Sequence, residues 1–184
     1  MMAGMFRTVS RLRSGYAPED VDEFFDHARE VYENGTTGDL SGTDVRLAAF
    51  DLVRGGYSTG AVDAALDRLE AAFVARSRAQ NVAKYGQQAW MNHLAEQARS
   101  LYGRLGRPER ERFAPAQSGH LGYDVDDVDA LCERLTAYFD HGEPLTAHEI
   151  RSATFRRRHG AKGYAEGPVD AFCARAIEVL LGVE

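Results

Sequence analysis

Apolar residues recur at helical spacing in four stretches of the chain, each of which follows a Gly-Tyr dipeptide. Five residues after each tyrosine lies a valine, and apolar or small residues occupy the positions three, four, seven and eleven residues beyond it. This spacing places them on one face of an α-helix. The four faces consist of Phe24, Phe25, Ala28 and Tyr32; Ala65, Leu66, Leu69 and Phe73; Leu131, Cys132, Leu135 and Phe139; and Phe172, Cys173, Ala176 and Leu180.

The dipeptide, the valine and a following aspartate make up a repeated motif, Gly-Tyr-x4-Val-Asp. Gly15 and Gly56 lie 41 residues apart, as do Gly122 and Gly163, and each later copy follows its counterpart by 107 residues. The chain is therefore a duplicated pair of motifs. We expect the two motif helices of each pair to lie parallel. The motif residues are Gly15, Tyr16, Val21 and Asp22; Gly56, Tyr57, Val62 and Asp63; Gly122, Tyr123, Val128 and Asp129; and Gly163, Tyr164, Val169 and Asp170.

A second shared element lies between the members of each pair. It reads LSGTDVRLAAF over residues 40–50 and LTAHEIRSATF over residues 145–155. Ser41 with Asp44, and Thr146 with Glu149, have the spacing of a helix capping box, which predicts a short helix in each element. The sequence thus predicts an all-α protein with no strands of consequence. Its units consist of a short helix, a Gly-Tyr loop and a longer helix.

Residues 74–105 link the two pairs and contain no proline. Two structures remain open for this segment, one long helix or a helical hairpin broken near Gly86. Gly106 is a plausible C-cap, and Pro108 follows it directly. We predict three parts: a first motif pair (1–73), a central helical segment with a linker (74–112), and a second motif pair (113–184).

Composition places the chain among globular proteins, because 44% of its residues are hydrophobic and 27% are charged. The formal net charge of −6 argues against a broad nucleic-acid surface, which needs a local excess of Lys and Arg. The N-terminus lacks the apolar segment of a secretory signal. We therefore expect a cytoplasmic protein.

The residues contain no convergent acid–base pair, no metal-ligand spacing and no phosphate-binding glycine loop. We expect a protein that is not an enzyme and holds no cofactor or metal. The motif aspartates are expected to stabilise the N-terminal ends of their helices, and the tyrosines to pack against the helix that follows each of them. Cys132 and Cys173 occupy equivalent positions and are interpreted as core residues.

The order of LTAHEIRSATF, a basic loop, Gly-Tyr, four residues, Val-Asp and an apolar helix resembles the N-terminal domain of the DivIVA family. These are bacterial proteins of division sites and growing poles. The two-pair layout is similar to that of actinobacterial DivIVA-domain repeat proteins. The resemblance implies a scaffold that self-associates through parallel helices, attaches to the inner face of the membrane and recruits division or wall-growth proteins.

The resemblance also implies an aromatic and a basic residue directly before Gly-Tyr, at a loop tip that enters lipid. Here these positions hold Arg13-Ser14, Arg54-Gly55, His120-Leu121 and Ala161-Lys162. The basic run Arg156 to Arg158 lies in the loop before the last Gly-Tyr. It has two interpretations, a contact with anionic headgroups or a solvated loop paired with acids. The candidate membrane or partner residues are Arg13, Arg54, Leu121, Arg156, Arg157, Arg158 and Lys162.

The N-terminal segment has two interpretations as well. Met2, Met5, Phe6, Val9 and Leu12 with three arginines would form a small amphipathic helix suited to a membrane interface. Alternatively, the segment is a degenerate copy of the short element, because Phe6 precedes Tyr16 by ten residues just as Phe113 precedes Tyr123.

The function we expect is therefore a cytoplasmic, DivIVA-like scaffold or adaptor, linked to bacterial cell division or polar growth through protein–protein contacts. Its expected partners are other proteins and further copies of itself. The alternative is a peripheral sensor that docks its basic loop tips weakly on anionic inner-membrane lipid, at the septum or pole. A nucleic-acid binder is a distant third, and no nucleic-acid partner is expected.

Overall fold

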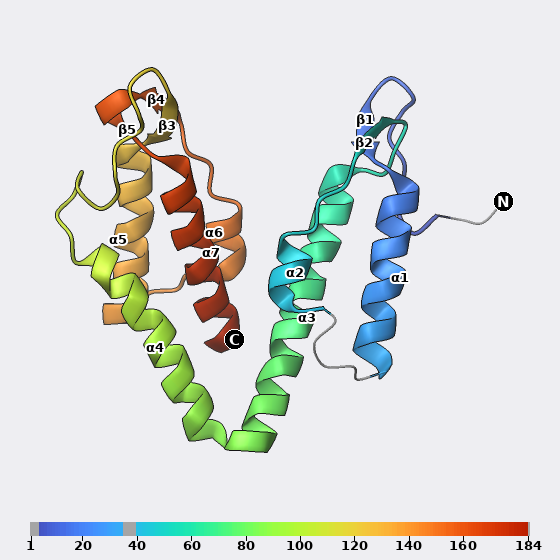
Figure 1. Cartoon of the computed structure of the whole chain (residues 1–184), viewed down its shortest axis with the longest axis horizontal. Coiled ribbons are helices and arrows are strands. Elements are labelled where there is room, and N and C mark those ends of the chain that lie inside the picture. The colour runs from blue at the N-terminus through green and yellow to red at the C-terminus, as the bar shows by residue number, and fades with distance from the viewer. Residues whose placement is uncertain (1–3, 35–39, 184) are drawn as a thin grey trace. The chain divides into compact units, whose positions relative to one another are not determined.

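A computed structural model describes residues 4–34 and 40–183 of the chain (Figure 1). The chain divides into two compact units, residues 1–79 and 80–184, which are treated separately below as unit 1 and unit 2. The predicted three-part division into residues 1–73, 74–112 and 113–184 stays a prediction. None of the helices in the described ranges combines the length and the apolar character that crossing a membrane requires.

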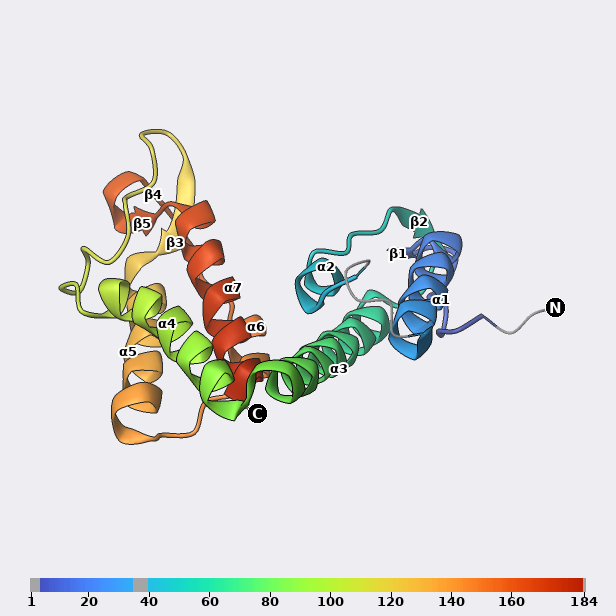
Figure 2. The same ribbon diagram turned by 60° about the horizontal axis from the view of Figure 1, so that its bottom comes forward.

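The described residues of unit 1 form two long helices, one short helix and a two-stranded sheet, and the second long helix continues past residue 79 to Tyr85. Strands β1 and β2 pair antiparallel, with Gly15 opposite Val53. The two long helices both begin beside this sheet and run away from it in the same direction (Figures 1 and 2). The elements are β1 (Ser14–Tyr16), α1 (Pro18–Asn34), α2 (Gly42–Arg46), β2 (Leu52–Arg54) and α3 (Thr59–Tyr85).

The core of unit 1 confirms that the two motif helices are parallel. Val21 and Val62, which begin the repeated faces, are fully buried and share one cluster with Tyr57. Further along, Ala28 and Val31 of α1 share a second cluster with Phe73 of α3. The first turns of α1 and α3 therefore contact each other, as do their later turns, which is the arrangement of two parallel helices. Each fully buried valine contributes roughly 1.5–3 kcal/mol relative to an exposed one.

Unit 2 repeats this plan and adds a helix and a strand. Its three-stranded antiparallel sheet has the order β4-β3-β5. Helices α5 and α7 each follow a strand of this sheet and run away from it, while α4 packs against both (Figure 1). The elements are α4 (Gln87–Leu105), β3 (Leu121–Asp124), α5 (Val125–His141), α6 (Ala147–Arg151), β4 (Arg157–His159), the 3₁₀ turn η1 (Gly160–Lys162), β5 (Gly163–Tyr164) and α7 (Glu166–Val183).

The prediction of an all-α fold is wrong. Helices account for 63% of the structure, but two small antiparallel sheets account for a further 10%. The Gly-Tyr dipeptides, expected to be loops, are strand residues or make bridges. These strands have two to four residues, which is too short for the alternating pattern that reveals a strand in sequence. Their pairing also joins copies about 40 residues apart, which no local pattern reports.

The two predicted capping boxes are confirmed. Complete capping boxes start both short helices, with Ser41 and Asp44 before α2 and Thr146 and Glu149 before α6. Asp124 caps α5 by accepting hydrogen bonds from the amides of Asp126 and Asp127. These caps satisfy amides that have no partner within the helix.

The helix of the central segment is interrupted at Gly86, the position at which one of the two predicted alternatives placed a break. Helix α3 ends at Tyr85 and α4 begins at Gln87, with Gly86 between them at φ 86°. Glycine adopts such a left-handed conformation without the strain that a Cβ would cause. Gly106 is the C-cap of α4, as predicted.

The described part of the N-terminal segment, residues 4–13, contains no helix, so the amphipathic-helix interpretation is wrong there. The segment instead runs alongside the second motif. The Val9 amide donates to the Gly56 carbonyl at 2.8 Å, and the Ser58 amide donates to the Arg7 carbonyl at 2.9 Å. Met2 lies outside the described residues.

Candidate functional site

The two Gly-Tyr dipeptides of unit 1 cross each other in backbone contact. The Tyr16 amide donates to the Tyr57 carbonyl at 3.0 Å, and the Tyr57 amide donates to the Tyr16 carbonyl at 2.8 Å. A Cβ added to Gly15 would overlap the Tyr57 carbonyl oxygen, and one added to Gly56 would overlap that of Tyr16. Glycine precedes each tyrosine because two backbones approach too closely here for any side chain.

The same crossing occurs in unit 2. Tyr123 of β3 lies opposite Tyr164 of β5 in the antiparallel ladder. A Cβ on Gly122 would overlap the Tyr164 carbonyl oxygen, as at the equivalent position of unit 1. The crossing is therefore a property of the motif pair rather than of one unit.

Each motif tyrosine reaches the aspartate of the other copy in its pair. The Tyr57 hydroxyl donates to both carboxylate oxygens of Asp22 at 3.0 Å, and Tyr16 hydrogen-bonds Asp63. Unit 2 repeats the exchange with Tyr164 to Asp129 and Tyr123 to Asp170. We call these four contacts the reciprocal Tyr–Asp pairs.

This arrangement adds to two predictions about these residues. Tyr57 shares a buried cluster with Val62 of the helix that follows it, but the hydroxyls of the motif tyrosines also bond the helix of the paired copy. The aspartates lie early in their helices, as expected, but they also accept a tyrosine hydroxyl. Sequence reasoning missed the exchange because the partners are 35 to 47 positions apart in the chain.

A phenylalanine of the paired copy contacts each motif tyrosine ring. The contacts are edge-to-face or tilted, geometries that aromatic rings favour. The degenerate-copy interpretation of the N-terminus gains support here, because Phe6 and Phe113 contact their tyrosines as the closing phenylalanines of the short elements do. The ring centroids are 5.4 Å apart for Tyr16 and Phe50, 5.5 Å for Tyr57 and Phe6, 5.1 Å for Tyr123 and Phe155, and 5.3 Å for Tyr164 and Phe113.

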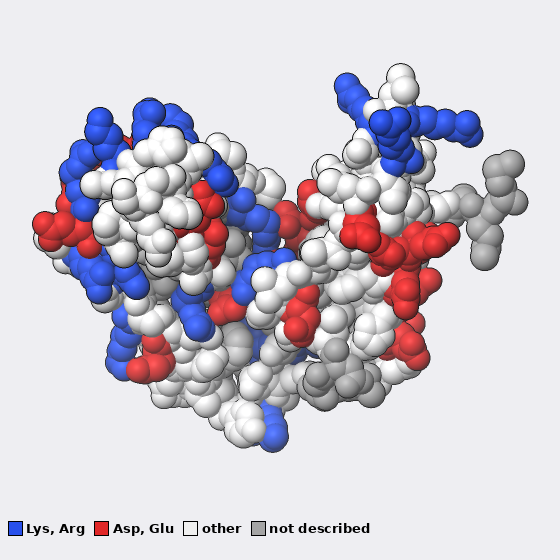
Figure 3. Space-filling model, turned by 45° about the horizontal axis from the view of Figure 1, so that its top comes forward, with Lys and Arg blue, Asp and Glu red and all other residues white. Residues whose placement is uncertain are grey.

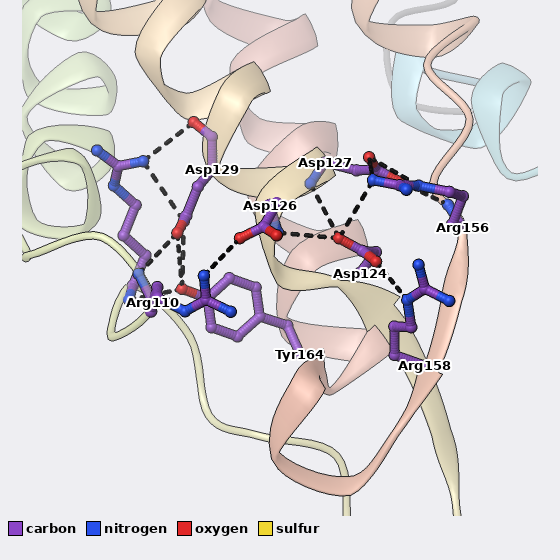
Figure 4. Close-up of polar contacts among 9 residues, drawn as sticks. Arg110, Asp124, Asp126, Asp127, Asp129, Arg156, Arg158 and Tyr164 are labelled. Carbon is purple, nitrogen blue, oxygen red and sulfur yellow. Dashed lines mark hydrogen bonds and ion pairs between the residues drawn. The ribbon is translucent and has the colours of Figure 1, made fainter.

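One of the two reciprocal Tyr–Asp pairs of unit 2, Tyr164 with Asp129, includes a buried ion pair that its counterpart in unit 1 lacks. Asp129 accepts the Arg110 amide at 2.6 Å and lies 3.4 Å from the Arg112 guanidinium (Figure 4). The side chains of Arg112 and Asp129 are 8% and 7% exposed. Unit 1 has Met5 at the position equivalent to Arg112. A buried charge of this kind is tolerated only while its partner is present.

Burial raises the pKa of all four motif tyrosines, and the neighbouring aspartates act in the same direction. The effect is largest for Tyr164, whose pKa rises to about 12. These hydroxyls therefore remain protonated donors at neutral pH, as the reciprocal pairs require. Burial likewise raises the pKa of the Cys132 and Cys173 thiols to about 12. Both cysteines are free. Cys132 is fully buried, in accord with the predicted core role, whereas Cys173 is only half-buried.

The pH dependence of unit 2 should reflect Tyr164. Because its folded-state pKa of about 12 exceeds the ordinary value of about 10, its contribution is fully present below about pH 10 and is lost as pH rises towards 12. We expect Tyr164→Phe to lower the free energy of unfolding at pH 8, and to make that free energy decline less steeply between pH 10 and 12, by up to about 1.4 kcal/mol per pH unit. Chemical denaturation at several pH values across this range provides the measurement. Cys132 and Cys173 are present in both the unsubstituted protein and the Tyr164→Phe variant, so their titration does not distinguish the two. If stability falls with pH equally steeply in both proteins, the raised pKa is not that of Tyr164.

The basic run of unit 2 is paired with acids, as one of its two interpretations predicted. Arg156 binds Asp127 through Nε and Nη2, at distances down to 2.6 Å, and Arg158 Nε donates to Asp124 at 2.6 Å (Figure 4). Arg157 lies 3.2 Å from Glu166.

These ion pairs lower the pKa of both aspartates. The hydrogen bond from Arg156 holds the pKa of Asp127 below its usual value. Burial raises the pKa of Asp124, but the Arg158 hydrogen bond, the helix amides and the Arg156 charge outweigh it and leave that pKa lowered. Both carboxylates are therefore charged at neutral pH.

The remaining candidate contact residues fall in two places. Arg13 and Arg54 lie together at the sheet of unit 1, where the Gly55 amide donates to the Arg13 carbonyl. Leu12 beside them is 89% exposed. Figure 3 shows arginine side chains gathered at this end of unit 1, whose sequence contains no lysine. In unit 2, Leu121 is 45% exposed opposite His159, and Lys162 lies in η1.

No group of three or more His, Cys, Asp or Glu side chains in residues 4–34 and 40–183 is arranged to hold a metal ion. The expectation of a protein without metal or cofactor stays a prediction. Comparison with known proteins found no family model, no curated protein and no solved structure that matches this chain.

Proposed function

We propose that this chain is a non-enzymatic, DivIVA-like scaffold or adaptor that acts in bacterial cell division or polar growth through protein–protein contacts. The observation that carries the proposal is the reciprocal Tyr–Asp pairing, which joins two motif copies into one unit. Each pair reproduces within a single chain the parallel helix pair that the DivIVA resemblance attributes to self-association. Two preformed helix pairs then serve as rigid docking platforms for partner proteins or further copies of the chain.

The contacts within the motif support a structural role for its repeated tyrosines, aspartates and glycines. In unit 1 the tyrosine hydroxyls and the aspartates of the two copies satisfy one another, and the glycines are required by backbone contact. Because these residues bond or pack against one another, their role is to stabilise the helix pair. Partner proteins would therefore contact the outer faces of the helices and the loop tips.

A second candidate function rests on the loop tip of unit 1. Leu12 projects into solvent between Arg11 and Arg13, and Arg54 lies opposite Ser14 in the adjacent strand. None of these three arginines has an ion-pair partner among the described residues. An exposed leucine within a cluster of cations suits an anionic lipid surface, where each cation contributes about 1 kcal/mol. The tip would attach the scaffold to the inner membrane face.

A fluorescent fusion of the full chain in its native cell tests both functions. The scaffold proposal predicts septal or polar foci, and a uniformly diffuse signal would contradict it. Leu12→Ser separates the two routes to such foci, because it removes the apolar tip but leaves the arginines in place. Foci that persist in Leu12→Ser would support recruitment by a protein partner, whereas foci that disappear would assign localisation to the membrane tip. Leu47→Ser, another exposed leucine of unit 1, is the matched control.

A further inference from the structure

Unit 2 contains a cavity of about 330 Å³ beside its sheet, and charged side chains line it. The lining comes from the segment after α4, the junction of β3 and α5, strand β4 with the residue before it, and the η1 turn. Four of the lining residues are cations and two are carboxylates. They are Arg110, Arg156, Arg158, Lys162, Asp124 and Asp126.

The carboxylates of this cavity hold its arginines in place. Asp124, with a side chain only 7% exposed, accepts Arg158 Nε as well as the first amides of α5. Asp126 accepts Arg110 Nη1 at 2.8 Å. The terminal nitrogens of Arg158 make no hydrogen bond to the residues described, and Lys162 has no ion-pair partner there. The cavity therefore offers guanidinium donors that are held by ion pairs and one exposed ammonium without such a partner among the described residues.

The fold does not require this cluster, because unit 1 is built the same way without it. The Asp124 amide donates to the Arg156 carbonyl at 2.8 Å, and the equivalent bond of unit 1 joins the Ala17 amide to the Asp51 carbonyl, also at 2.8 Å. In the sheets, Arg158 lies opposite Gly122 as Val53 lies opposite Gly15. Unit 1 thus has Ala17, Asp51 and Val53 at the positions of Asp124, Arg156 and Arg158, with the same backbone pairing.

We propose that this cavity binds the dianion of a phosphate monoester. Guanidinium groups match the oxygens of a phosphate group in geometry, and a lysine adds a point charge that can follow the ligand. A volume of about 330 Å³ is at the small end of ligand sites, in keeping with one phosphate group and a short substituent. The site is independent of the scaffold role, so either proposal can fail alone.

The distribution of acids around the cavity favours a small soluble ligand over an extended anionic surface. Asp126 lines the cavity beside Arg110 with 65% of its side chain exposed, and Asp127 remains paired with Arg156. These carboxylates would repel a membrane or a nucleic-acid backbone laid across the opening. They leave room for a single group that enters between the cations.

Titration with inorganic phosphate and with O-phosphoserine, followed by NMR of the arginine and lysine side-chain signals, tests the proposal. At pH 8, where phosphate is a dianion, we expect saturable shifts. At pH 5, where it carries one charge, we expect binding at least about fivefold weaker. Serine should cause no shift. Absence of saturable shifts at pH 8, or equal affinity at both pH values, would overturn the proposal.

Lys162→Gln should weaken phosphate binding about tenfold or more, because this exposed lysine supplies a charge without holding the fold together. Arg175→Gln, which removes a surface cation of α7 paired with Glu178, is the control and should leave the affinity unchanged. Equal affinities in the two variants would overturn the site assignment. A further test is sedimentation of the protein with vesicles that contain a phosphorylated phosphoinositide. If the protein sediments with them and inorganic phosphate does not displace it, the small-ligand proposal is overturned in favour of a membrane contact.

Discussion

Replacement of Gly15 by alanine is expected to destabilise unit 1 by at least about 3 kcal/mol. The added Cβ would overlap the carbonyl oxygen of Tyr57 and crowd the backbone of Gly56, so no side-chain rotation can relieve the contact. The two motif copies would have to separate, which breaks the amide–carbonyl bonds between Tyr16 and Tyr57. Hydrogen exchange measured by mass spectrometry should show loss of protection in α1 and the start of α3.

Gly60→Ala is the matched control for this substitution. Gly60 lies in the first turn of α3, and no heavy atom lies within 4 Å of the position that its Cβ would occupy. Alanine is the better helix former, so we expect unchanged or slightly increased stability, by up to about 1 kcal/mol. Similar protection of unit 1 in the Gly15 and Gly60 variants would show that the crossing of the Gly-Tyr dipeptides is not under steric constraint.

Asp129→Ala should destabilise unit 2 by about 3–5 kcal/mol, because it leaves the buried Arg112 guanidinium without its carboxylate. The Tyr164 hydroxyl and the Arg110 amide lose the same acceptor. The equivalent change in unit 1, Asp22→Ala, removes only the Tyr57 hydrogen bond and should cost about 1 kcal/mol. Chemical denaturation, with hydrogen exchange to identify the unit affected, measures both effects.

The double variant Arg112→Met/Asp129→Ala should recover most of the lost stability. It installs the residue that unit 1 carries at the equivalent position, Met5, and removes both charges together. Buried ion pairs replaced by apolar groups often leave stability unchanged or raise it. If the double variant is no more stable than Asp129→Ala alone, the cost comes from the lost tyrosine hydrogen bond rather than from the unpaired arginine.

Much of the helical architecture could be predicted from local sequence alone. The apolar spacing that starts at Val21 and Val62 reports one buried face of a helix, and both valines are fully buried. Ser41 with Asp44, and Thr146 with Glu149, act over three residues, so the capping boxes were visible as well. The break at Gly86 remained open between two structures because glycine in a helical segment permits a break without requiring one.

Only some of the residues that line the cavity could be predicted from the sequence. The run Arg156 to Arg158 and Lys162 stood out as basic, and pairing with acids was one of its two interpretations. Nothing in their spacing identified Asp124 and Asp127, about 30 positions earlier, as the partners that orient them. Arg110, from the segment after α4, carried no signal of its own. An ion pair depends on distance in space, and sequence patterns report distance along the chain.

The sequence by itself determined the repeat, its helices and the apolar faces that they bury, since these follow from interactions between residues three to eleven positions apart. Only the tertiary structure decided what the Gly-Tyr dipeptides do. In that structure the two copies of each pair cross, the dipeptides lie in short strands or isolated bridges, and each tyrosine bonds the aspartate of the other copy. A two-residue strand has no periodicity, and a hydrogen bond between distant copies leaves no local mark. The exchange arises when burial of two equivalent helix faces brings the copies together.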